Sequence, residues 1–367
     1  MNRIQTLKIS GLRNLQGIEI SPAPRLNLIY GENGSGKTSL LEAIHLLSSG
    51  RSFRSSKLDP LINYELDQAL VFAQLDDGIR LGLSKSRRRR HQLRMQDETQ
   101  RNWESVARSL PLQIIDATAF QLLEGGPKAR RRFLDWGVFH VEQGFISAWR
   151  DSRKCLANRN ALLKQDRFDL AQLEAWDREF VTASEQMDGH RRDYMQKFLP
   201  IFREVYSQLE GAHGDELALS YSRGWASDRS FAEELLRSRD LDRRYGSTQV
   251  GPQRADIIVR LERAPAVEVL SRGQQKILVS ALKIAQGRLL SDCLGANCLY
   301  LIDDLPSELD AENRARVFDA LLSLDSQLFV TCVELGSLVH APGGSLFANL
   351  GRGEKAQFHV EHGRITA

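Results

Sequence analysis

One segment near the start of the chain has the residue types and the spacing of a phosphate-binding loop. It reads Gly31-Glu32-Asn33-Gly34-Ser35-Gly36-Lys37-Thr38 and matches the pattern GxxxxGK[ST] at every position. The glycines let consecutive backbone N–H groups turn towards phosphate oxygens, because only glycine adopts the required backbone angles at little cost. We therefore expect the whole segment to bind ATP, with Lys37 reaching the β- and γ-phosphates and the Thr38 hydroxyl coordinating Mg²⁺.

A pair of acidic residues is the second candidate for the same chemistry. The apolar run Leu299-Tyr300-Leu301-Ile302 predicts a buried strand, and Asp303 and Asp304 follow it directly. Parallel sheets place ligands at the carboxyl ends of their strands. We expect Asp303 to hold Mg²⁺, directly or through water. Asp304 would polarise the attacking water, so that Asp304 and Lys37 are the two expected catalytic residues. The alternative, an ordinary acidic turn after a strand, is less consistent with the phosphate loop.

A third segment is similar to the signature of ABC-type ATPases. Leu270-Ser271-Arg272-Gly273-Gln274-Gln275 resembles LSGGQ, with Arg272 in place of the first glycine. We expect Ser271, Gly273 and Gln274 to form a second phosphate clamp at a helix N-terminus, contributed in trans by another copy of the chain. Taken alone, Ser271 would be an ordinary helix cap. Its position roughly thirty residues before the acidic strand end favours the signature, and Ser307-Glu308-Leu309-Asp310 follows where such ATPases carry their D-loop.

Three basic clusters are candidates for contact with polyanions. Arg87, Arg88, Arg89 and Arg90 form a dense cluster that suits phosphate contacts of DNA, or else a solvated loop. Arg51, Arg54 and Lys57 suit either DNA or nucleotide. A third group opens a predicted helix, where cations oppose the helix dipole, so a ligand or a partner is expected there. Its members are Lys128, Arg130, Arg131 and Arg132.

The elements around the phosphate loop can be predicted from hydrophobic spacing. Apolar residues at 4–9 and 18–20 predict two strands around a turn at 11–17, and a third strand at 26–29 runs into the loop. Helical spacing from Leu40 to Leu47 predicts a helix that ends near Gly50. Alternation over 66–83 predicts a hairpin turned at 76–78, and we expect an exposed hairpin or loop at 85–94.

The rest of the chain divides into a helical middle and a mixed last third. Residues 127–209 have helical spacing that suits several helices, with Pro200 interrupting them, and lack sustained heptads. Strands are expected at 217–221, 257–261, 298–302 and 327–330, and helices at 273–290 and 313–322. The last third therefore alternates helix and strand, as an α/β sheet does.

Composition and charge fit a soluble globular protein that meets a polyanion. Hydrophobic residues make up 42% and charged residues 26% of the 367 residues. The net charge of +3 divides into +10 over residues 1–165 and −7 over 166–367. The four cysteines form no CxxC pair, so reduced thiols are expected rather than a zinc site. No apolar run approaches the roughly 20 residues that cross a bilayer, which predicts no membrane partner and a cytoplasmic location.

Several further stretches resemble the RecF family of bacterial recombination-repair proteins over the whole chain. They are Gly50-Arg51-Ser52-Phe53-Arg54-Ser55, Gly125-Gly126-Pro127-Lys128, Arg131-Arg132-Phe133-Leu134-Asp135-Trp136-Gly137 and Leu301-Ile302-Asp303-Asp304. The resemblance implies a weak, DNA-dependent ATPase that dimerises with ATP on duplex or gapped DNA. It also implies cooperation with RecR (and RecO) in loading RecA at gaps, and roles in replication-fork repair and the SOS response.

The fold we expect is an α/β, ABC-type (Rad50/SMC-like) P-loop ATPase head with an inserted compact helical lobe and no long coiled coil. Residues 1–115 and 246–367 would form the head, and residues 116–245 the lobe. One departure from the family is visible: the family often has His in a GPH segment, where this chain reads Gly251-Pro252-Gln253-Arg254, so a role for that position is in doubt. Transporter ATPases end the corresponding strand near a His, whereas Thr331 follows Phe329-Val330 here, which is similar to the RecF pattern and argues against a transporter.

Three rival functions make different predictions. A transporter subunit would have roughly one hundred residues between phosphate loop and signature, whereas Lys37 and Ser271 are more than two hundred apart. A non-catalytic DNA clamp would not need both Asp303 and Asp304. An RNA- or break-processing head of the same superfamily would normally carry long coiled coils, which the sequence lacks.

Overall fold

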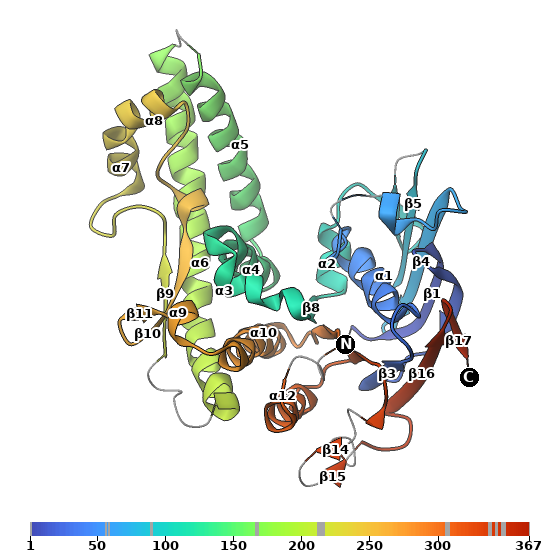
Figure 1. Ribbon diagram of the computed structural model, residues 1–367. Coiled ribbons are helices and arrows are strands. Elements are labelled where there is room, and N and C mark those ends of the chain that lie inside the picture. The colour runs from blue at the N-terminus through green and yellow to red at the C-terminus, as the bar shows by residue number, and fades with distance from the viewer. Residues whose placement is uncertain are drawn as a thin grey trace. The chain divides into compact units, whose positions relative to one another are not determined.

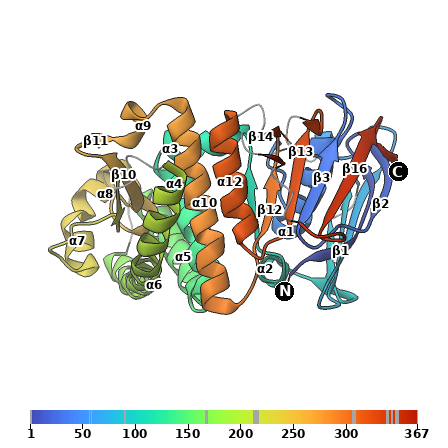
Figure 2. The same ribbon diagram turned by 90° about the horizontal axis from the view of Figure 1, so that it is seen from below.

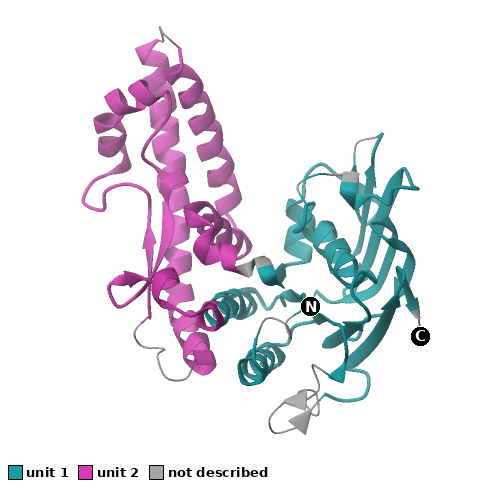
Figure 3. Ribbon diagram, viewed as in Figure 1, with its two compact units in different colours: residues 1–119, 276–367 teal, residues 120–275 magenta. Residues whose placement is uncertain are grey.

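The computed structural model describes residues 2–55, 57, 59–88, 91–165, 169–210, 217–304, 309–336, 340–341, 344–345 and 350–366. The chain divides into two compact units, one of residues 1–119 and 276–367 and the other of residues 120–275 (Figure 3). The domain boundaries predicted from the sequence, between residues 115 and 116 and between residues 245 and 246, stay a prediction. No helix among the described residues is long and apolar enough to cross a membrane.

An antiparallel sheet forms one layer of the first unit. Its six strands are β1 (Ile4–Leu12), β2 (Leu15–Ile20), β4 (Gln68–Leu75), β5 (Arg80–Ser86), β6 (Gln92–Met95) and β7 (Glu98–Gln100), in the order β2-β1-β4-β5-β6-β7. Buried and accessible residues alternate along β4, as expected for a sheet with one face on a core. The predicted hairpin at 66–83 is confirmed, and Leu75 and Ile79 close its turn.

A mostly parallel sheet forms the other layer of this unit. Its strands are β3 (Leu26–Tyr30), β8 (Leu112–Ile115), β12 (Leu299–Ile302), β13 (Leu328–Cys332), β16 (Lys355–Glu361) and β17 (Arg364–Thr366), in the order β17-β16-β3-β13-β12-β8. All pairs except β16–β17 are parallel. Strand β13 lies between β3 and β12 (Figure 2), so the ends of β3, β13 and β12 meet at one edge.

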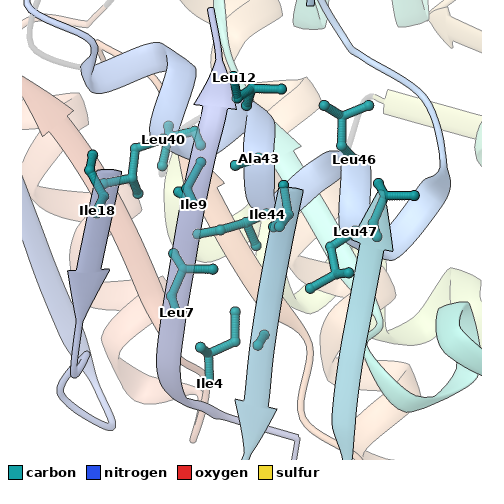
Figure 4. Close-up of a cluster of buried hydrophobic side chains, with 14 of the residues drawn as sticks. Ile4, Leu7, Ile9, Leu12, Ile18, Leu40, Ala43, Ile44, Leu46 and Leu47 are labelled. Carbon is teal, nitrogen blue, oxygen red and sulfur yellow. The ribbon is translucent and has the colours of Figure 1, made fainter. Parts of the chain in front are cut away.

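Helix α1 (Lys37–Ser49) packs against strands of both sheets, β1 and β4 in one and β13 in the other. Leu40, Ala43, Ile44 and Leu47 point into a cluster of fully buried side chains that also contains residues of β1 and β2 (Figure 4). Gly50 ends the helix in the left-handed conformation, with φ at 72°. The predicted helix and its end are therefore confirmed.

Further helices complete the first unit. They are α2 (Glu104–Ser109), α12 (Ala311–Ser323) and most of α10 (Arg272–Leu294), within which the boundary between the two units falls. Asp310 caps α12 by accepting a hydrogen bond from the Asn313 N–H at 2.8 Å. The helices expected at 273–290 and 313–322 are therefore confirmed.

The second unit consists of helices and a small antiparallel sheet. Its helices are α3 (Gln121–Glu124), α4 (Gly126–Val141), α5 (Phe145–Leu163), α6 (Leu170–Glu210), α7 (Phe231–Arg237), α8 (Arg239–Tyr245) and α9 (Ala266–Val269). Strands β9 (Leu217–Ser222), β10 (Asp256–Leu261) and β11 (Ala264–Pro265) form the sheet. Helices α5 and α6 run alongside each other (Figure 1).

A buried ion-pair network joins three helices of this unit. The Arg159 side chain on α5 is fully buried and donates to Asp177 on α6 and to Asp242 on α8, both at 2.7 Å. It also donates to the Thr248 hydroxyl at 2.8 Å. Breaking one partner of such a network leaves a buried charge unpaired, so these residues fix how the helices pack.

Two predictions about this fold are wrong. The turn between β1 and β2 is confined to Arg13 and Asn14 instead of extending from 11 to 17, because Arg13 adopts a left-handed backbone with φ at 54°. Pro200 does not interrupt the helices, because it lies inside α6, which is one continuous helix of 41 residues. Tyr194, Phe198, Phe202 and Tyr206 recur four residues apart, are buried and stack in sequence, while Pro200 is exposed, so packing outweighs the lost hydrogen bond.

Candidate functional site

The phosphate loop connects β3 directly to α1. Gly31 and Gly36 have φ of 147° and 122°, which other residues rarely adopt. A Cβ on Gly31 would lie 2.2 Å from the Val360 carbonyl oxygen of β16, and one on Gly36 would lie 2.8 Å from the Leu15 side chain. Gly31 therefore requires glycine for backbone angle and for space, and Gly36 requires it for backbone angle. No acidic residue occupies the first turn of α1, so the positive end of the helix is available to an anion.

Lys37 lies across the loop that it follows. Its ammonium donates to the carbonyl oxygens of Gly31 at 2.7 Å and Glu32 at 2.8 Å. Burial lowers the pKa of Lys37, and Asp304, Cys332 and Asp303 oppose that shift. The Ser35 hydroxyl in the same loop is buried and has no hydrogen-bond partner among the described residues. An unpartnered hydroxyl beside a cation at the start of a helix fits the phosphates of a nucleotide.

Asp303 is the centre of a hydrogen-bond network that joins the end of β12 to β13 and to the first turn of α1. Its Oδ1 accepts from the Thr38 hydroxyl at 3.0 Å and from the Thr331 hydroxyl at 2.7 Å. Burial raises the pKa of Asp303, and the two threonine hydrogen bonds act in the opposite direction. The Thr38 and Asp303 oxygens are the hard ligands that Mg²⁺ prefers, so the predicted pair fits the metal. Residues 265 apart in sequence are brought together here.

Asp304 has a backbone conformation that separates it from Asp303. Its φ is 53°, in the left-handed region that costs a non-glycine residue roughly 1 kcal/mol or more. Its backbone N–H donates to the Thr331 hydroxyl at 3.0 Å, and its side chain is exposed. The Thr331 hydroxyl thus positions both acids, Asp303 through its carboxylate and Asp304 through its backbone N–H.

Thr331 and Asn14 are site residues that the sequence analysis did not identify. The Asn14 amide donates to the Gly34 carbonyl at 3.0 Å and its oxygen accepts from Ser39 at 3.0 Å, so it fastens the loop to α1. Thr331 is the next-to-last residue of β13, the strand that lies between the phosphate-loop strand and the acidic strand. A hydroxyl residue at the end of a predicted strand was the available signal for Thr331; nothing in the sequence marked Asn14.

A cavity of about 660 Å³ lies over the phosphate loop. Lys37, Thr38, Asp303, Asp304 and Thr331 line it. This volume is in the range of small-molecule sites, which is about 300–1,000 Å³. The cavity therefore has room for a nucleotide beside its phosphate-binding groups.

Arg54 and Arg87 also line this cavity. The Arg87 guanidinium donates to the carbonyl oxygens of Ile62 at 3.1 Å and Asn63 at 3.3 Å. Arg88 is exposed and lies 3.6 Å from Asp67. Arg89 and Arg90 lie outside the described residues. Contact between this cluster and DNA stays a prediction, and Arg87 in addition contributes positive charge to the nucleotide cavity.

The signature segment begins α10. The Ser271 N–H donates to Gln274 Oε1 at 3.0 Å, and the Gln274 N–H donates to the Ser271 hydroxyl at 3.3 Å, which is a reciprocal cap. A Cβ on Gly273 would meet no atom within 4 Å, so that face is open. Arg272, in place of the usual glycine, pairs with Glu124 and lies 5.2 Å from the Phe120 ring centre. Ser307 and Glu308 of the D-loop lie outside the described residues.

Gln253, the departure from the family pattern, folds back on its own turn. Its amide donates to the Val250 carbonyl at 2.7 Å, while its Oε1 is buried without a partner among the described residues. A Cβ on Gly251 would lie 2.8 Å from that oxygen. The side chain therefore closes the short 3₁₀ helix Pro252–Arg254 instead of pointing outward.

The sequence pattern described as "RecF/RecN/SMC N terminal domain" matches residues 3–343. The chain is 46% identical over 370 residues to the DNA replication and repair protein RecF of Stutzerimonas stutzeri, covering 99% of this chain and 97% of that protein. It is 47% identical over 362 residues to the RecF of Azotobacter vinelandii, covering 98% and 96%.

Solved structures show the same fold. The recombination mediator protein RecF-ATP in the RecFOR pathway matches with a TM-score of 0.84 at 23% identity, covering 99% of this chain and 96% of that one. An Smc head bound to the C-winged helix domain of ScpA matches with a TM-score of 0.59 at 14% identity, covering 99% and 96%. These likenesses confirm the expected mixed α/β, ABC-type head without a long coiled coil.

Proposed function

The chain belongs to the RecF family of DNA replication and repair proteins, and from that premise we propose that it is an ATP-dependent DNA-binding repair protein. Two copies would associate head to tail across bound ATP, and slow hydrolysis would release them. The observation that carries the proposal is the 3.0 Å contact between the Thr38 hydroxyl and Asp303 Oδ1. It joins the phosphate loop to the acidic strand end, which is the arrangement that phosphoryl transfer requires.

The site residues divide the chemistry among them. Lys37, the loop N–H groups and the Ser35 hydroxyl would bind the phosphates. Thr38 and Asp303 would hold Mg²⁺, which would neutralise phosphate charge when bound. Asp304, exposed on the cavity, would accept a hydrogen bond from the attacking water and orient it. Thr331 would keep both acids in these separate roles, so hydrolysis needs no covalent intermediate on the protein.

Dimerisation would use the open start of α10. Ser271, Gly273 and Gln274 would contact the γ-phosphate held by the partner copy, as the signature of ABC-type ATPases does. Support comes from the exposed Ser271 side chain and from the unobstructed Gly273. The γ-phosphate would link the two copies, and its removal would separate them, so hydrolysis acts as a timer.

The DNA-related part of the proposal follows from family membership and charge. The excess of positive charge in residues 1–165 suits sequence-independent contact with duplex or gapped DNA. Membership in the family further supports cooperation with RecR and RecO in loading RecA, replication-fork repair and a contribution to the SOS response. Such work would take place in the cytoplasm, beside the bacterial chromosome.

Light scattering tests the proposal directly. We expect a monomer without nucleotide, a dimer with Mg²⁺ and ATP, and a dimer that is tighter when a short duplex is present. Lys37→Ala should stay monomeric, because it lacks the cation at the phosphates. A parent protein that remains monomeric with ATP and duplex together would refute the head-to-tail dimer. Dimerisation that Lys37→Ala also shows would remove ATP from the explanation.

A further inference from the structure

The basic residues at the start of α4 differ in what they contact. Arg130 has its charge fully matched, because its Nε and Nη2 donate to the two carboxylate oxygens of Asp256, both at 2.8 Å. Its Nη1 donates to the Leu123 carbonyl at 3.0 Å. Arg130 therefore has a structural role, joining α4 to β10.

Arg131, the next residue, has no carboxylate of its own. Its Nη1 donates to the Ala255 carbonyl at 2.7 Å, and it makes no other hydrogen bond to a residue that the structure describes. The two acids nearby have partners already: Asp256 binds Arg130, and Asp135 Oδ1 accepts from Arg191 at 2.7 and 2.9 Å. Most donors of the Arg131 guanidinium are consequently unused.

Arg254 lies next to the carbonyl that Arg131 contacts. It precedes Ala255 in the chain, is exposed, and among the described residues hydrogen-bonds through its side chain to the Gln249 oxygen at 3.1 Å. The 3₁₀ helix that carries Arg254 is also held by the buried Arg191, which donates to the Pro252 carbonyl at 2.9 Å. The guanidinium groups of Arg131 and Arg254 are therefore both anchored to the same short segment.

The charge of this cluster is unbalanced. Four guanidinium groups (Arg130, Arg131, Arg191 and Arg254) face two carboxylates (Asp135 and Asp256), an excess of two positive charges. Burial lowers the pKa of Arg131 first, and Arg191 and Arg254 lower it further. The first turn of α4 contains no acid either. A half-buried cation among like charges costs folding free energy, and such costs are typical of sites where a ligand supplies the missing charge.

We propose that Arg131 and Arg254 form a phosphate-binding site in the second unit, and that its ligand is a backbone phosphate of duplex DNA. The inference rests on the proposed DNA-binding function. A guanidinium fork matches phosphate oxygens, and two such groups without a base-reading side chain would bind DNA of any sequence. Lys128 and Arg132 are exposed on the same helix and extend the positive surface, which suits the regularly spaced phosphates of a duplex better than a single small anion.

The test compares Arg131→Gln and Arg254→Gln in the full chain with the parent. Fluorescence anisotropy with a labelled duplex over a range of salt concentrations gives the salt dependence of binding. Each variant should make the negative slope of log K against log salt shallower by about 0.9, and weaken binding on the order of five- to tenfold at 0.1 M salt. The melting temperature of Arg131→Gln should equal or exceed that of the parent, because the substitution removes the uncompensated cation. Arg178→Gln, an exposed position on α6 with the same change of charge, should leave the slope unchanged.

The outcomes separate this site from the rest of the proposal. Unchanged slopes in both variants would overturn it. If Arg131→Gln does not fold, the exposed Arg254→Gln decides alone: a shallower slope would support the site, and an unchanged slope would refute it. Thermal shift with inorganic phosphate gives a second readout, in which parent and variants all keep the phosphate loop and its response. A larger stabilisation of the parent than of the variants, with unchanged DNA slopes, would mean a free-phosphate site and refute the DNA ligand. A parent that binds no duplex would refute the proposed function, while the phosphate measurement would still test the site.

Discussion

Asp303 is a carboxylate that folding makes harder to ionise. Because burial raises its pKa, the folded protein binds the proton more tightly than the unfolded chain does. The charged side chain therefore lowers stability at pH values above its folded pKa, and that penalty disappears as pH falls through this pKa. The cost is retained, in our interpretation, because the charge is needed to hold Mg²⁺.

Asp303→Asn should stabilise the protein in the absence of nucleotide and metal. We expect a gain on the order of 1 kcal/mol at pH 7.5, or about 2–4 °C in melting temperature, which shrinks as the pH is lowered through the raised pKa of Asp303. The variant should also lose the extra stability that Mg²⁺ and ATP give the parent. Thermal unfolding in EDTA over a pH series from 7.5 downwards, with Asp319→Asn on the exposed face of α12 as control, measures this. A variant less stable than the parent at pH 7.5 would mean that the threonine hydrogen bonds to the carboxylate outweigh its burial.

Thr331 is a positioning residue that can be tested with nearly isosteric variants. Thr331→Val removes the hydroxyl that donates to Asp303 and accepts from the Asp304 N–H. An unpartnered buried polar group costs about 1–3 kcal/mol, so we expect turnover to fall roughly 10- to 100-fold and more Mg²⁺ to be required. ATP binding measured in EDTA should stay within a few-fold, because the phosphate loop is intact.

Thr331→Ser provides the matched control, since it keeps the hydroxyl and removes only a methyl group. It should restore turnover to within a few-fold of the parent and restore the Mg²⁺ requirement. Equal losses in the Val and Ser variants would show that packing, and not the hydroxyl, explains the effect.

At the scale of elements, α6 contains a residue that works against its own helix. Pro200 cannot donate the backbone hydrogen bond to residue 196, and the exposed face of the helix gives it no packing in return. Pro200→Ala should raise stability by about 1–3 kcal/mol, since proline is roughly 3 kcal/mol less favourable than alanine inside a helix.

Thermal unfolding followed by far-UV circular dichroism checks this expectation. Gln196→Ala, an exposed α6 position one turn earlier, is the control and should change stability by less than about 0.5 kcal/mol. If Pro200→Ala lowered stability, the proline would have a favourable role in bending or positioning the end of α6.

At the scale of the whole molecule, a substitution at Gly273 can test association of two copies without disturbing the folding of either. Alanine fits there without contact and is the better helix former, so Gly273→Ala should preserve or slightly raise the melting temperature. The added methyl group would occupy the space where the partner's γ-phosphate must approach. We expect unchanged ATP affinity of the monomer and at least tenfold weaker ATP-dependent dimerisation by light scattering. Loss of monomer ATP affinity would instead place the signature in the same-chain site.

Mixing Gly273→Ala with Lys37→Ala sharpens this test. One of the two composite sites in a mixed dimer would combine an intact Lys37 with an intact Gly273, and the other would carry both defects. Partial recovery of ATP-dependent association on mixing, absent from either variant alone, would support sites shared between copies.

The candidate phosphate-binding residues and most of the elements that carry them could be predicted from the sequence. Residues 31–38 are contiguous, so the strand, the loop and the start of α1 follow from local backbone preferences and short-range hydrophobic spacing. The same holds for the strand before Asp303 and for the serine cap of α10, since each depends on neighbours within about one helical turn or one strand. Gly50 as a helix end was equally local.

Only the tertiary structure decided which of these residues meet. Thr38, Asp303 and Thr331 come together because β13 pairs in parallel between β3 and β12, and the pairing of β3 with β13 joins Leu26 to Leu328 from opposite ends of the chain. Pro200 remains helical because aromatic side chains on the opposite face of α6 pack into the core of the second unit. Arg130 has a carboxylate partner and Arg131 has none, because Asp256 pairs with Arg130. Local backbone preference and the number of charges are properties of the sequence. The pairing of strands and the pairing of opposite charges depend on which distant groups the fold brings into contact.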